Sequence, residues 1–306
     1  KIASERLIFS LIYVILQRNS SEEKDMLDCI IVGSGIAGIS AALTLKANGK
    51  NFMLLGSPDL SVKISRAECI RNYPGLSSVT GREFTRALKK QLAEAEISVT
   101  DERVSGVYAM GGKFAVLTQS GVSFESKTVI LATGVESVKR LDGEEEFLGR
   151  GVSYCATCDG FLYKGKTIGV LSTSKRFEHE VEYLAKLAGK VYLMPMYKDV
   201  GDFSENVEKI IKMPLAVKGE KKVNRLVFKD GELPVDGVFL LKESISPAVL
   251  VGGLEMSEGH VAVARDMSTN LKGCFAAGDC TGRPYQYAKA AGEGNIAAHS
   301  VSAMEE

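Results

Sequence analysis

Two cysteines separated by two residues, Cys155 and Cys158, are the side chains best suited to chemistry, and Asp159 follows them directly. Such a pair can close a disulfide or open to a dithiol, and a neighbouring carboxyl group can supply or accept the proton that each exchange step needs. The alternatives are half of a zinc site or two inert buried cysteines. A zinc site is disfavoured because only three histidines are present and no second pair with this spacing exists among the other cysteines, Cys29, Cys69, Cys274 and Cys280. The sequence therefore predicts redox chemistry at residues 155–159 and no metal site.

The composition excludes several classes of partner. The chain has 306 residues, of which 45% are apolar and 25% charged, and its formal net charge is zero. Such a chain can form one large core or two medium-sized ones and has no overall attraction to nucleic acid or to a membrane surface. Six cysteines without framework spacing are typical of a reducing compartment, where a disulfide is more often catalytic than structural. We expect a cytoplasmic protein that binds no nucleic acid.

Residues 1–25 are interpreted as an N-terminal extension. Leu7–Leu16 is an apolar run of ten residues between Arg6 and Arg18. It is too short for a membrane-spanning helix, and no small-residue cleavage site follows it. It could be a weak anchor or docking segment, or an upstream extension or a helix packed on the body. No integral membrane segment is predicted.

A dinucleotide-binding turn is expected near the start of the main body. An apolar strand pattern at residues 27–32 leads into Gly33-Ser34-Gly35-Ile36-Ala37-Gly38, and a helical pattern follows to residue 50. Gly33 would make the turn, Gly35 would let the backbone approach a pyrophosphate, and Gly38 would allow close packing of helix and strand. The helix N-terminus favours the negative charge of that pyrophosphate. The next strand ends in Gly56, where an acidic residue for the adenosine ribose would be expected.

Two later segments are suited to the same ligand. A buried strand at residues 128–131 ends in Ala132-Thr133-Gly134, whose small size suits backbone packed against a cofactor. Another apolar strand ends in Gly278-Asp279, and such an aspartate can hold a sugar-like hydroxyl chain. The helix that closes the body starts among Tyr285, Gln286 and Tyr287, and it would point its N-terminus at a ring.

A second nucleotide-binding fold is expected in the middle of the chain, without the chemistry of its site. Residues 167–171 and 190–194 are predicted strands, and residues 178–187 are the helix between them. The intervening turn, residues 172–177, contains no glycine, and residues 195–198 contain no pair of arginines for a ribose 2′-phosphate. Backbone that carries side chains is a poor cradle for a pyrophosphate. The predicted fold class is therefore α/β, with two Rossmann-like three-layer nucleotide-binding domains.

Residues 61–90 carry a local excess of five positive charges. Seven basic residues stand against Glu68 and Glu83, and they are Lys63, Arg66, Arg71, Arg82, Arg86, Lys89 and Lys90. Such a face would steer an acidic partner toward it. An ordinary solvated helix at residues 81–95 is the alternative interpretation.

Together these residues resemble the low-molecular-weight thioredoxin reductase family of flavoproteins. The resemblance covers about residues 26–302 and rests on four motifs in the family's order: 33–38, 132–134, 155–159, and Gly278-Asp279 with Gln286. It implies FAD bound by a domain split into residues 26–149 and 245–306, with the second domain, residues 150–244, inserted between. It also implies that Cys158 is the thiol near the flavin, that Cys155 attacks the disulfide of thioredoxin, and that Asp159 is the acid/base. Asp279 and the backbone at residues 285–287 would hold the flavin.

The departures from the family pattern indicate the electron donor. Family members that use NADPH carry a glycine-rich turn and a basic pair in the inserted domain, where this chain has residues 172–174 and 195–198. The pattern resembles the branch reduced by ferredoxin, so thioredoxin and ferredoxin are the expected partners of a homodimer. The alternatives are an NADPH-dependent reductase with a degenerate site, a dithiol oxidase of the same fold, and a flavin-bearing redox sensor. The intact Cys155, Cys158 and Asp159 argue against the sensor.

Overall fold

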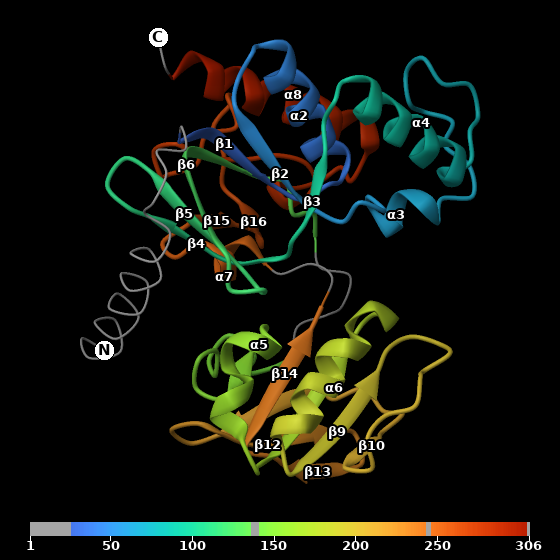
Figure 1. Ribbon diagram of the computed structural model, residues 1–306, viewed down its shortest axis with the longest axis vertical. Coiled ribbons are helices and arrows are strands. Elements are labelled where there is room, and N and C mark those ends of the chain that lie inside the picture. The colour runs from blue at the N-terminus through green and yellow to red at the C-terminus, as the bar shows by residue number, and fades with distance from the viewer. Residues whose placement is uncertain (1–25, 136–140, 243–245, 305–306) are drawn as a thin grey trace. The chain divides into compact units, whose positions relative to one another are not determined.

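The computed structural model describes residues 26–135, 141–242 and 246–304, which form two compact units (Figure 1). The first contains the described residues up to 118, residues 122–134 and residues from 247 onward. The second contains residues 119–121 and the described residues between 135 and 246. These divisions lie at 134 and 247, whereas the sequence-based boundaries lie at 149 and 245. The predicted N-terminal extension lies outside the described residues.

The first unit is built on a mixed sheet. Its parallel strands are β1 (Leu27–Val32), β2 (Phe52–Gly56), β3 (Val99–Asp101), β6 (Ser123–Leu131) and β17 (Cys274–Ala276). The antiparallel strands β4 (Val104–Ala109) and β5 (Phe114–Thr118) extend it, giving the order β3-β2-β1-β6-β5-β4 with β17 beside the end of β6. The carboxyl ends of β1, β6 and β17 therefore meet at one edge of this sheet.

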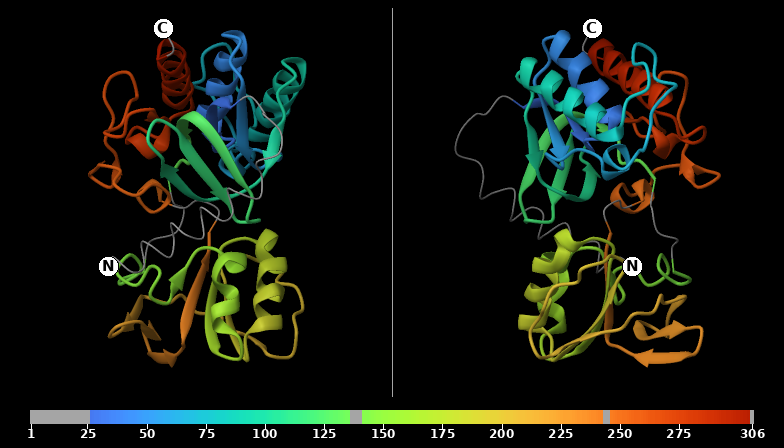
Figure 2. Two further views of the ribbon diagram at one scale, coloured as in Figure 1. Left: turned by 60° about the vertical axis from the view of Figure 1, so that its left-hand side comes forward. Right: turned by 90° about the vertical axis from the view of Figure 1, so that its right-hand side faces the viewer.

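Helices α2 (Ile36–Ala47) and α8 (Tyr287–Ala303) lie side by side in the first unit (Figures 1 and 2). Both contribute buried residues to one core with β1, β2 and helix α4 (Gly81–Glu94). Helix α4 begins at a capping box, in which Thr80 and Glu83 satisfy each other's backbone N–H groups. The unit is completed by α3 (Val62–Ser65), α7 (Pro247–Leu250), the strands β15 (Met256–Ser257) and β16 (His260–Val261), and the 3₁₀ turn η3 (Asp279–Thr281).

The second unit contains a five-stranded, fully parallel sheet. Its order is β10-β9-β8-β14-β7, and the strands are β7 (Val152–Ser153), β8 (Thr167–Ser172), β9 (Lys190–Pro195), β10 (Val207–Lys209) and β14 (Gly237–Leu241). Every residue of β14 is buried, as expected for a strand covered on both faces. The short elements α5 (Ala156–Asp159), η1 (Gly160–Tyr163) and η2 (Lys175–Phe177) connect the strands to the helical layer.

Three layers make up the second unit. Helix α6 (Glu178–Leu187) packs on one face of the sheet and shares its core with β8, β9 and β14. A small antiparallel sheet of β11 (Ala216–Gly219), β12 (Val223–Phe228) and β13 (Gly231–Pro234) approaches the other face. The approach is so close that a Cβ atom at Gly169 would lie 2.5 Å from a methyl group of Leu226. The predicted α/β class with two Rossmann-like domains is confirmed. Within the described residues, no helix is both long and apolar enough to cross a membrane.

Candidate active site

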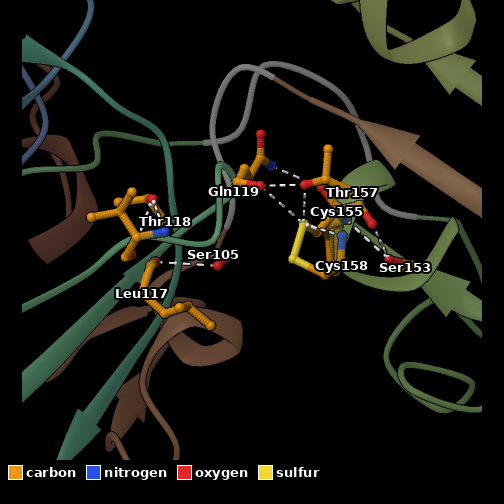
Figure 3. The surroundings of a disulfide bond; sticks show 10 residues. Ser105, Leu117, Thr118, Gln119, Ser153, Cys155, Thr157 and Cys158 are labelled. Carbon is orange, nitrogen blue, oxygen red and sulfur yellow. Dashed lines mark hydrogen bonds between the residues drawn. A yellow bond between two sulfur atoms is a disulfide. The ribbon is translucent and has the colours of Figure 1, made fainter. Parts of the chain in front are cut away.

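The cysteine pair forms a closed disulfide at the carboxyl edge of the parallel sheet of the second unit. Strand β7 ends at Ser153, and Cys155 and Cys158 follow with an Sγ–Sγ distance of 2.02 Å (Figure 3). Cys155 also caps α5, because its Sγ accepts a hydrogen bond from the backbone N–H of Cys158 at 3.1 Å. Ligand and reaction sites of parallel α/β sheets usually lie at this edge.

The two sulfurs differ in accessibility. Cys155 is 5% exposed, whereas Cys158 is among the exposed residues. A reductant therefore reaches the Cys158 side of the disulfide more easily. Attack on one sulfur of a disulfide releases the other as a thiolate, so reduction from this side would free Cys155.

Polar groups from outside the Cys-x-x-Cys motif hold its backbone. The Ser153 hydroxyl accepts from the Cys155 N–H at 3.1 Å, and the Gln119 side chain donates from Nε2 to the Tyr154 carbonyl at 2.9 Å (Figure 3). The Thr157 hydroxyl donates to the Gln119 carbonyl. Gln119 lies on the turn after β5, and no local pattern in the sequence links it to the cysteines.

The elements beyond the disulfide combine a carboxyl group with exposed apolar side chains. Asp159 is half-buried directly after Cys158, and its charge adds to the effect of burial, which raises the pKa of Tyr163. Phe161 is 63% exposed and Leu162 is 51% exposed. Large exposed apolar side chains next to a reactive site are typical of a protein-binding surface.

The glycine turn of the first unit has the geometry of a dinucleotide cradle. Gly33 adopts φ +117°, and a Cβ atom there would lie 2.3 Å from the carbonyl oxygen of Ala132. A Cβ at Gly38 would lie 1.8 Å from the carbonyl oxygen of Gly33. A Cβ at Gly35, in contrast, would meet nothing within 4 Å, so the space in front of the helix N-terminus is open. The first and third glycines are needed for packing, and the second borders room for a ligand.

Two other segments with predicted cofactor residues lie next to this turn. Ile36 and Ala37 are buried at the start of α2, and Ala132, Thr133 and Gly134 follow β6. Gly278 adopts φ +90°, with its Cβ position 2.9 Å from the Cβ of Ala37. The structure therefore brings the segments at residues 33–38, 132–134 and 278–279 together, although they are far apart in the sequence.

Asp279 is half-buried at the start of η3. Burial raises the pKa of its carboxyl group, and the negative charge of Glu293 adds to this rise. The positive charges of Lys63 and Lys289 partly offset it. Folding thus disfavours the ionised carboxylate. A carboxylate whose ionisation the folded protein disfavours does not contribute to stability. Its position is better explained by a role in binding a ligand.

A charged network that the sequence analysis did not identify supports the Gly278-Asp279 turn. The Lys289 ammonium donates to the carbonyl oxygens of Gly278 and Gly282, at 2.9 and 2.8 Å. The Glu293 carboxylate accepts from the Gly278 N–H and from the Thr281 hydroxyl, both at 2.8 Å. Lys289 and Glu293 lie one helical turn apart on α8, so this helix fixes the position of Asp279.

The start of α8 is held by side chains of the first unit. Gln286 precedes the helix, and its Oε1 accepts from the Asn72 amide at 2.7 Å. The Tyr287 ring packs edge-on to Phe84, and the exposed Tyr285 lies with its hydroxyl 2.7 Å from Nε2 of His260. These contacts hold the N-terminal end of α8 in place, and with it the N–H groups of the first helical turn.

Replacing Asp279 with asparagine should stabilise the apoprotein at neutral pH. Because the folded-state pKa is raised, the ionised carboxylate disfavours folding above that pKa, and the difference disappears as the pH falls toward the ordinary value of 3.8. Thermal unfolding of Asp279→Asn and wild-type apoprotein across this range measures the effect. The same variant should bind the dinucleotide cofactor expected in this unit about tenfold more weakly, because a charged hydrogen-bond acceptor is lost. Equal unfolding temperatures at pH 7 would show that the raised pKa has no effect on stability.

In the second unit the Glu178 side chain stands at the start of α6, the end of the helix where a Rossmann fold usually holds a nucleotide phosphate. The turn between β8 and α6 contains no glycine, and Glu178 is the first residue of α6. The Glu178 carboxylate accepts from the Gly201 N–H at 2.8 Å and from the Tyr197 hydroxyl at 3.2 Å. Burial, with the charge of Glu178, raises the pKa of Tyr197 to about 12. A negative side chain of the protein therefore lies at the helix end that would otherwise attract an anion.

The three buried thiols among the remaining cysteines are poorly suited to exchange. Burial raises the pKa of Cys29 to about 12 and the pKa values of Cys274 and Cys280 to about 11. Cys69 is exposed. Within the described ranges, no group of three or more His, Cys, Asp or Glu side chains is arranged to hold a metal ion.

Comparison with known proteins gives relatives over nearly the whole chain. Residues 27–177 match the pyridine nucleotide-disulphide oxidoreductase family. A thioredoxin reductase of Helicobacter pylori is 34% identical over 90% of this chain and 98% of its own, and one of Aquifex aeolicus is 31% identical over 82% and 84%. A solved structure of a ferredoxin-flavin thioredoxin reductase from Clostridium acetobutylicum is 45% identical, with a TM-score of 0.85 over 92% of this chain and 97% of its own. A thioredoxin reductase structure from Gloeobacter violaceus is 28% identical, with a TM-score of 0.76 over 91% and 94%.

Proposed function

We propose that this chain, which belongs to the low-molecular-weight thioredoxin reductase family, takes its electrons from reduced ferredoxin. The family assignment confirms the resemblance inferred from the four motifs. In the proposed reaction, electrons pass by way of FAD and the Cys155–Cys158 disulfide to thioredoxin. The ferredoxin-flavin thioredoxin reductase from Clostridium acetobutylicum is 45% identical to this chain, whereas the Gloeobacter violaceus enzyme is 28% identical.

The Glu178 carboxylate at the start of α6 is the observation that carries the proposal about the electron donor. A pyridine nucleotide would have to place its pyrophosphate at the start of α6, beside a carboxylate that already accepts from Gly201 and Tyr197. The Glu178 carboxylate would repel the negative charge of the pyrophosphate, and the glycine-free turn is poorly suited to backbone contact with phosphate. Without this site the enzyme needs another donor, and ferredoxin is a protein that supplies electrons singly.

The residues of the first unit fit FAD. The open space at Gly35 and the N-terminus of α2 would take the pyrophosphate, and Asp279 would accept from hydroxyl groups of the ribityl chain. The first turn of α8, after Gln286, would lie near the flavin ring, and residues 132–134 would pack against the cofactor. When bound, FAD supplies the redox centre that accepts electrons one at a time and delivers them in pairs.

Opening of the disulfide consumes two electrons and one proton, and it yields one thiol and one thiolate. With reduction at the exposed Cys158 sulfur, Cys155 becomes the thiolate. Its sulfur then attacks the disulfide of thioredoxin, forming a mixed disulfide and releasing one thioredoxin thiolate. Cys158 attacks the Cys155 sulfur in turn, which regenerates the enzyme disulfide and releases reduced thioredoxin. Its two sulfurs take up the proton given up by Cys158 and a second proton from water. We assign to Asp159 the transfer of protons to and from the Cys158 thiol.

Phe161 and Leu162 provide a surface for thioredoxin. They follow the disulfide by three and four residues and expose apolar side chains at 63% and 51%. A protein substrate must cover the disulfide while exchange occurs, and apolar side chains at its border would bind that substrate.

The basic segment at residues 61–90 provides a surface for an acidic ferredoxin. All seven of its basic residues are exposed, including Arg82 and Arg86 on α4. The segment also borders the proposed flavin site. The positive charge of Lys63 opposes the rise in the pKa of Asp279, and the Asn72 amide donates to the side chain of Gln286. Ferredoxin bound there would deliver electrons close to the cofactor.

Reversing the charges of Arg82 and Arg86 should slow ferredoxin-linked turnover. The double variant Arg82→Glu/Arg86→Glu is expected to lower kcat/KM for ferredoxin about tenfold at low ionic strength and to flatten its salt dependence. The matched control is Lys221→Glu/Lys222→Glu, which changes the same number of exposed charges on the second unit. If both double variants behave alike, the docking surface lies elsewhere.

Reconstitution tests the proposed reaction itself. Holoenzyme with reduced ferredoxin should reduce thioredoxin catalytically, whereas holoenzyme with NADPH alone should not. Sustained turnover with NADPH would contradict the proposal.

Two further features belong to the proposal. We place the enzyme in the cytoplasm, where its unpaired cysteines would stay reduced.

We also propose a homodimer, supported by Ile296 and Met304 of the α8 segment, whose apolar side chains are exposed. Light scattering during size-exclusion chromatography measures the oligomeric state.

A further inference from the structure

We infer that a buried network of Glu144, Lys242 and Tyr154 positions Cys155 for thiol exchange. The inference rests on the proposed reductase function, because it concerns the thiol that attacks thioredoxin. None of the three residues belongs to one of the four motifs, and none takes part in the reaction steps proposed above.

The network is almost fully shielded from water. Glu144, Lys242 and Tyr154 are 1%, 2% and 6% exposed. The Lys242 Nζ lies 2.6 Å from Oε1 of Glu144, and the Tyr154 hydroxyl donates to the same oxygen at 2.5 Å. The second carboxylate oxygen accepts from the N–H of Leu141 at 2.9 Å. The Lys242 ammonium also lies 5.8 Å from the centre of the Tyr154 ring.

The network joins the ends of two neighbouring strands at the point where the disulfide begins. Tyr154 follows β7 and Lys242 follows β14, and these strands pair in parallel through Val238–Val152 and Phe239–Ser153. Glu144 comes from the segment that precedes β7. One carboxylate therefore connects the residue directly after β14 with the residue directly before Cys155.

Stability alone does not explain such a network. A buried ion pair generally contributes little or nothing to stability compared with apolar side chains of similar size, because desolvation opposes the attraction between the charges. The geometric effect is more specific. Tyr154 is fixed at its hydroxyl by Glu144 and at its carbonyl by Gln119.

Cys155 consequently has little freedom. Its N–H donates to the Ser153 hydroxyl. The residue before it, Tyr154, is held at its hydroxyl and at its carbonyl group. Thiol exchange needs the attacking sulfur in line with the disulfide that it opens, and small displacements of a reacting group slow such steps strongly. Glu144, Lys242 and Tyr154 are therefore positioning residues for this cysteine.

The test measures exchange by Cys155 separately from electron supply. Holoenzyme carrying Cys69→Ser, which removes the exposed free thiol, is reduced with dithiothreitol, freed of excess reductant and mixed with oxidised thioredoxin. For the reaction with the small disulfide DTNB the protein also carries Cys158→Ser, so that Cys155 is the thiol of the pair that reacts. Tyr154→Phe removes only the hydroxyl, and we expect exchange with both disulfides to slow about tenfold. Tyr197→Phe is the matched control, because it removes another tyrosine hydroxyl from a carboxylate in the same unit; it should exchange at the wild-type rate.

A second variant separates positioning from stability. Glu144→Leu/Lys242→Met removes both charges together, so no charge is left buried without its partner, and the unfolding temperature should stay close to that of wild type. Its exchange rate should nevertheless fall as in Tyr154→Phe. Wild-type exchange rates in Tyr154→Phe would overturn the inference, whether or not the double variant folds. A wild-type enzyme that reacts with DTNB but not with thioredoxin would instead contradict the proposed function and leave this comparison intact with DTNB.

Discussion

Cys155→Ser is expected to abolish thioredoxin reduction while the protein still binds FAD. Without this thiolate no mixed disulfide with thioredoxin can form, so turnover should fall by on the order of a thousandfold or more. The residue lies in the second unit, whereas the residues that would hold FAD lie in the first. Steady-state turnover and the flavin spectrum measure the two effects in one preparation.

The contrasting variant is Cys158→Ser, which keeps the attacking thiol and removes the one that resolves the mixed disulfide. We expect it to react once with a thioredoxin whose attacking cysteine carries a thionitrobenzoate group and whose second cysteine is absent. This reaction should release the yellow thiol and leave a covalent complex through Cys155. Cys155→Ser should form no such complex. A complex formed by Cys155→Ser would reverse the assigned roles of the two cysteines.

Substitutions in the first glycine turn should separate folding from FAD binding. Gly38→Ala would place a Cβ atom 1.8 Å from a backbone oxygen, so the strand and helix would have to move apart. We expect a loss of about 3 to 5 kcal/mol in the free energy of unfolding. Gly35→Ala meets no protein atom within 4 Å, and Gly35 has φ −78° and ψ −175°, which alanine adopts without strain. Its apoprotein should fold almost normally.

The two alanine variants should therefore differ in what they lose. Gly35→Ala fills the space expected for the pyrophosphate and should weaken FAD binding at least about tenfold, or about 1.4 kcal/mol. Denaturant unfolding of the apoproteins and FAD titration measure the two effects. Wild-type FAD affinity in Gly35→Ala would mean that the pyrophosphate lies elsewhere, whereas a stable Gly38→Ala apoprotein would show that the close contact can relax.

Features carried by neighbouring residues could be predicted from the sequence. The strand, Gly33-Ser34-Gly35 turn and helix follow from spacing, because each glycine acts on backbone a few residues away. The Cys155–Cys158 disulfide is local for the same reason. The missing glycines at residues 172–174 predict the loss of the nucleotide site, and beside this turn the structure has Glu178 bound to Gly201 and Tyr197. The loss of the site stays a prediction.

Contacts between distant residues could not be predicted in this way. Glu144 and Lys242 are 98 residues apart, and their meeting depends on the order and register of β7 and β14. Gln119 reaches the cysteine pair from a turn that no motif marks. Lys289 and Glu293 form an ordinary-looking helical pair in the sequence, and only the approach of Gly278 gives them a further role.

The most direct test of the account is the anaerobic response of the bound flavin to each candidate donor. NADPH and then NADH are added in excess to the yellow holoenzyme, followed by catalytic reduced ferredoxin with thioredoxin present. We predict that neither nucleotide bleaches the flavin, and that ferredoxin bleaches it and supports turnover. Rapid bleaching by NADPH would contradict the account, because it would mean that the turn beside Glu178 can hold a pyrophosphate. A flavin that ignores all three donors but is reduced by a small dithiol would indicate a dithiol oxidase instead.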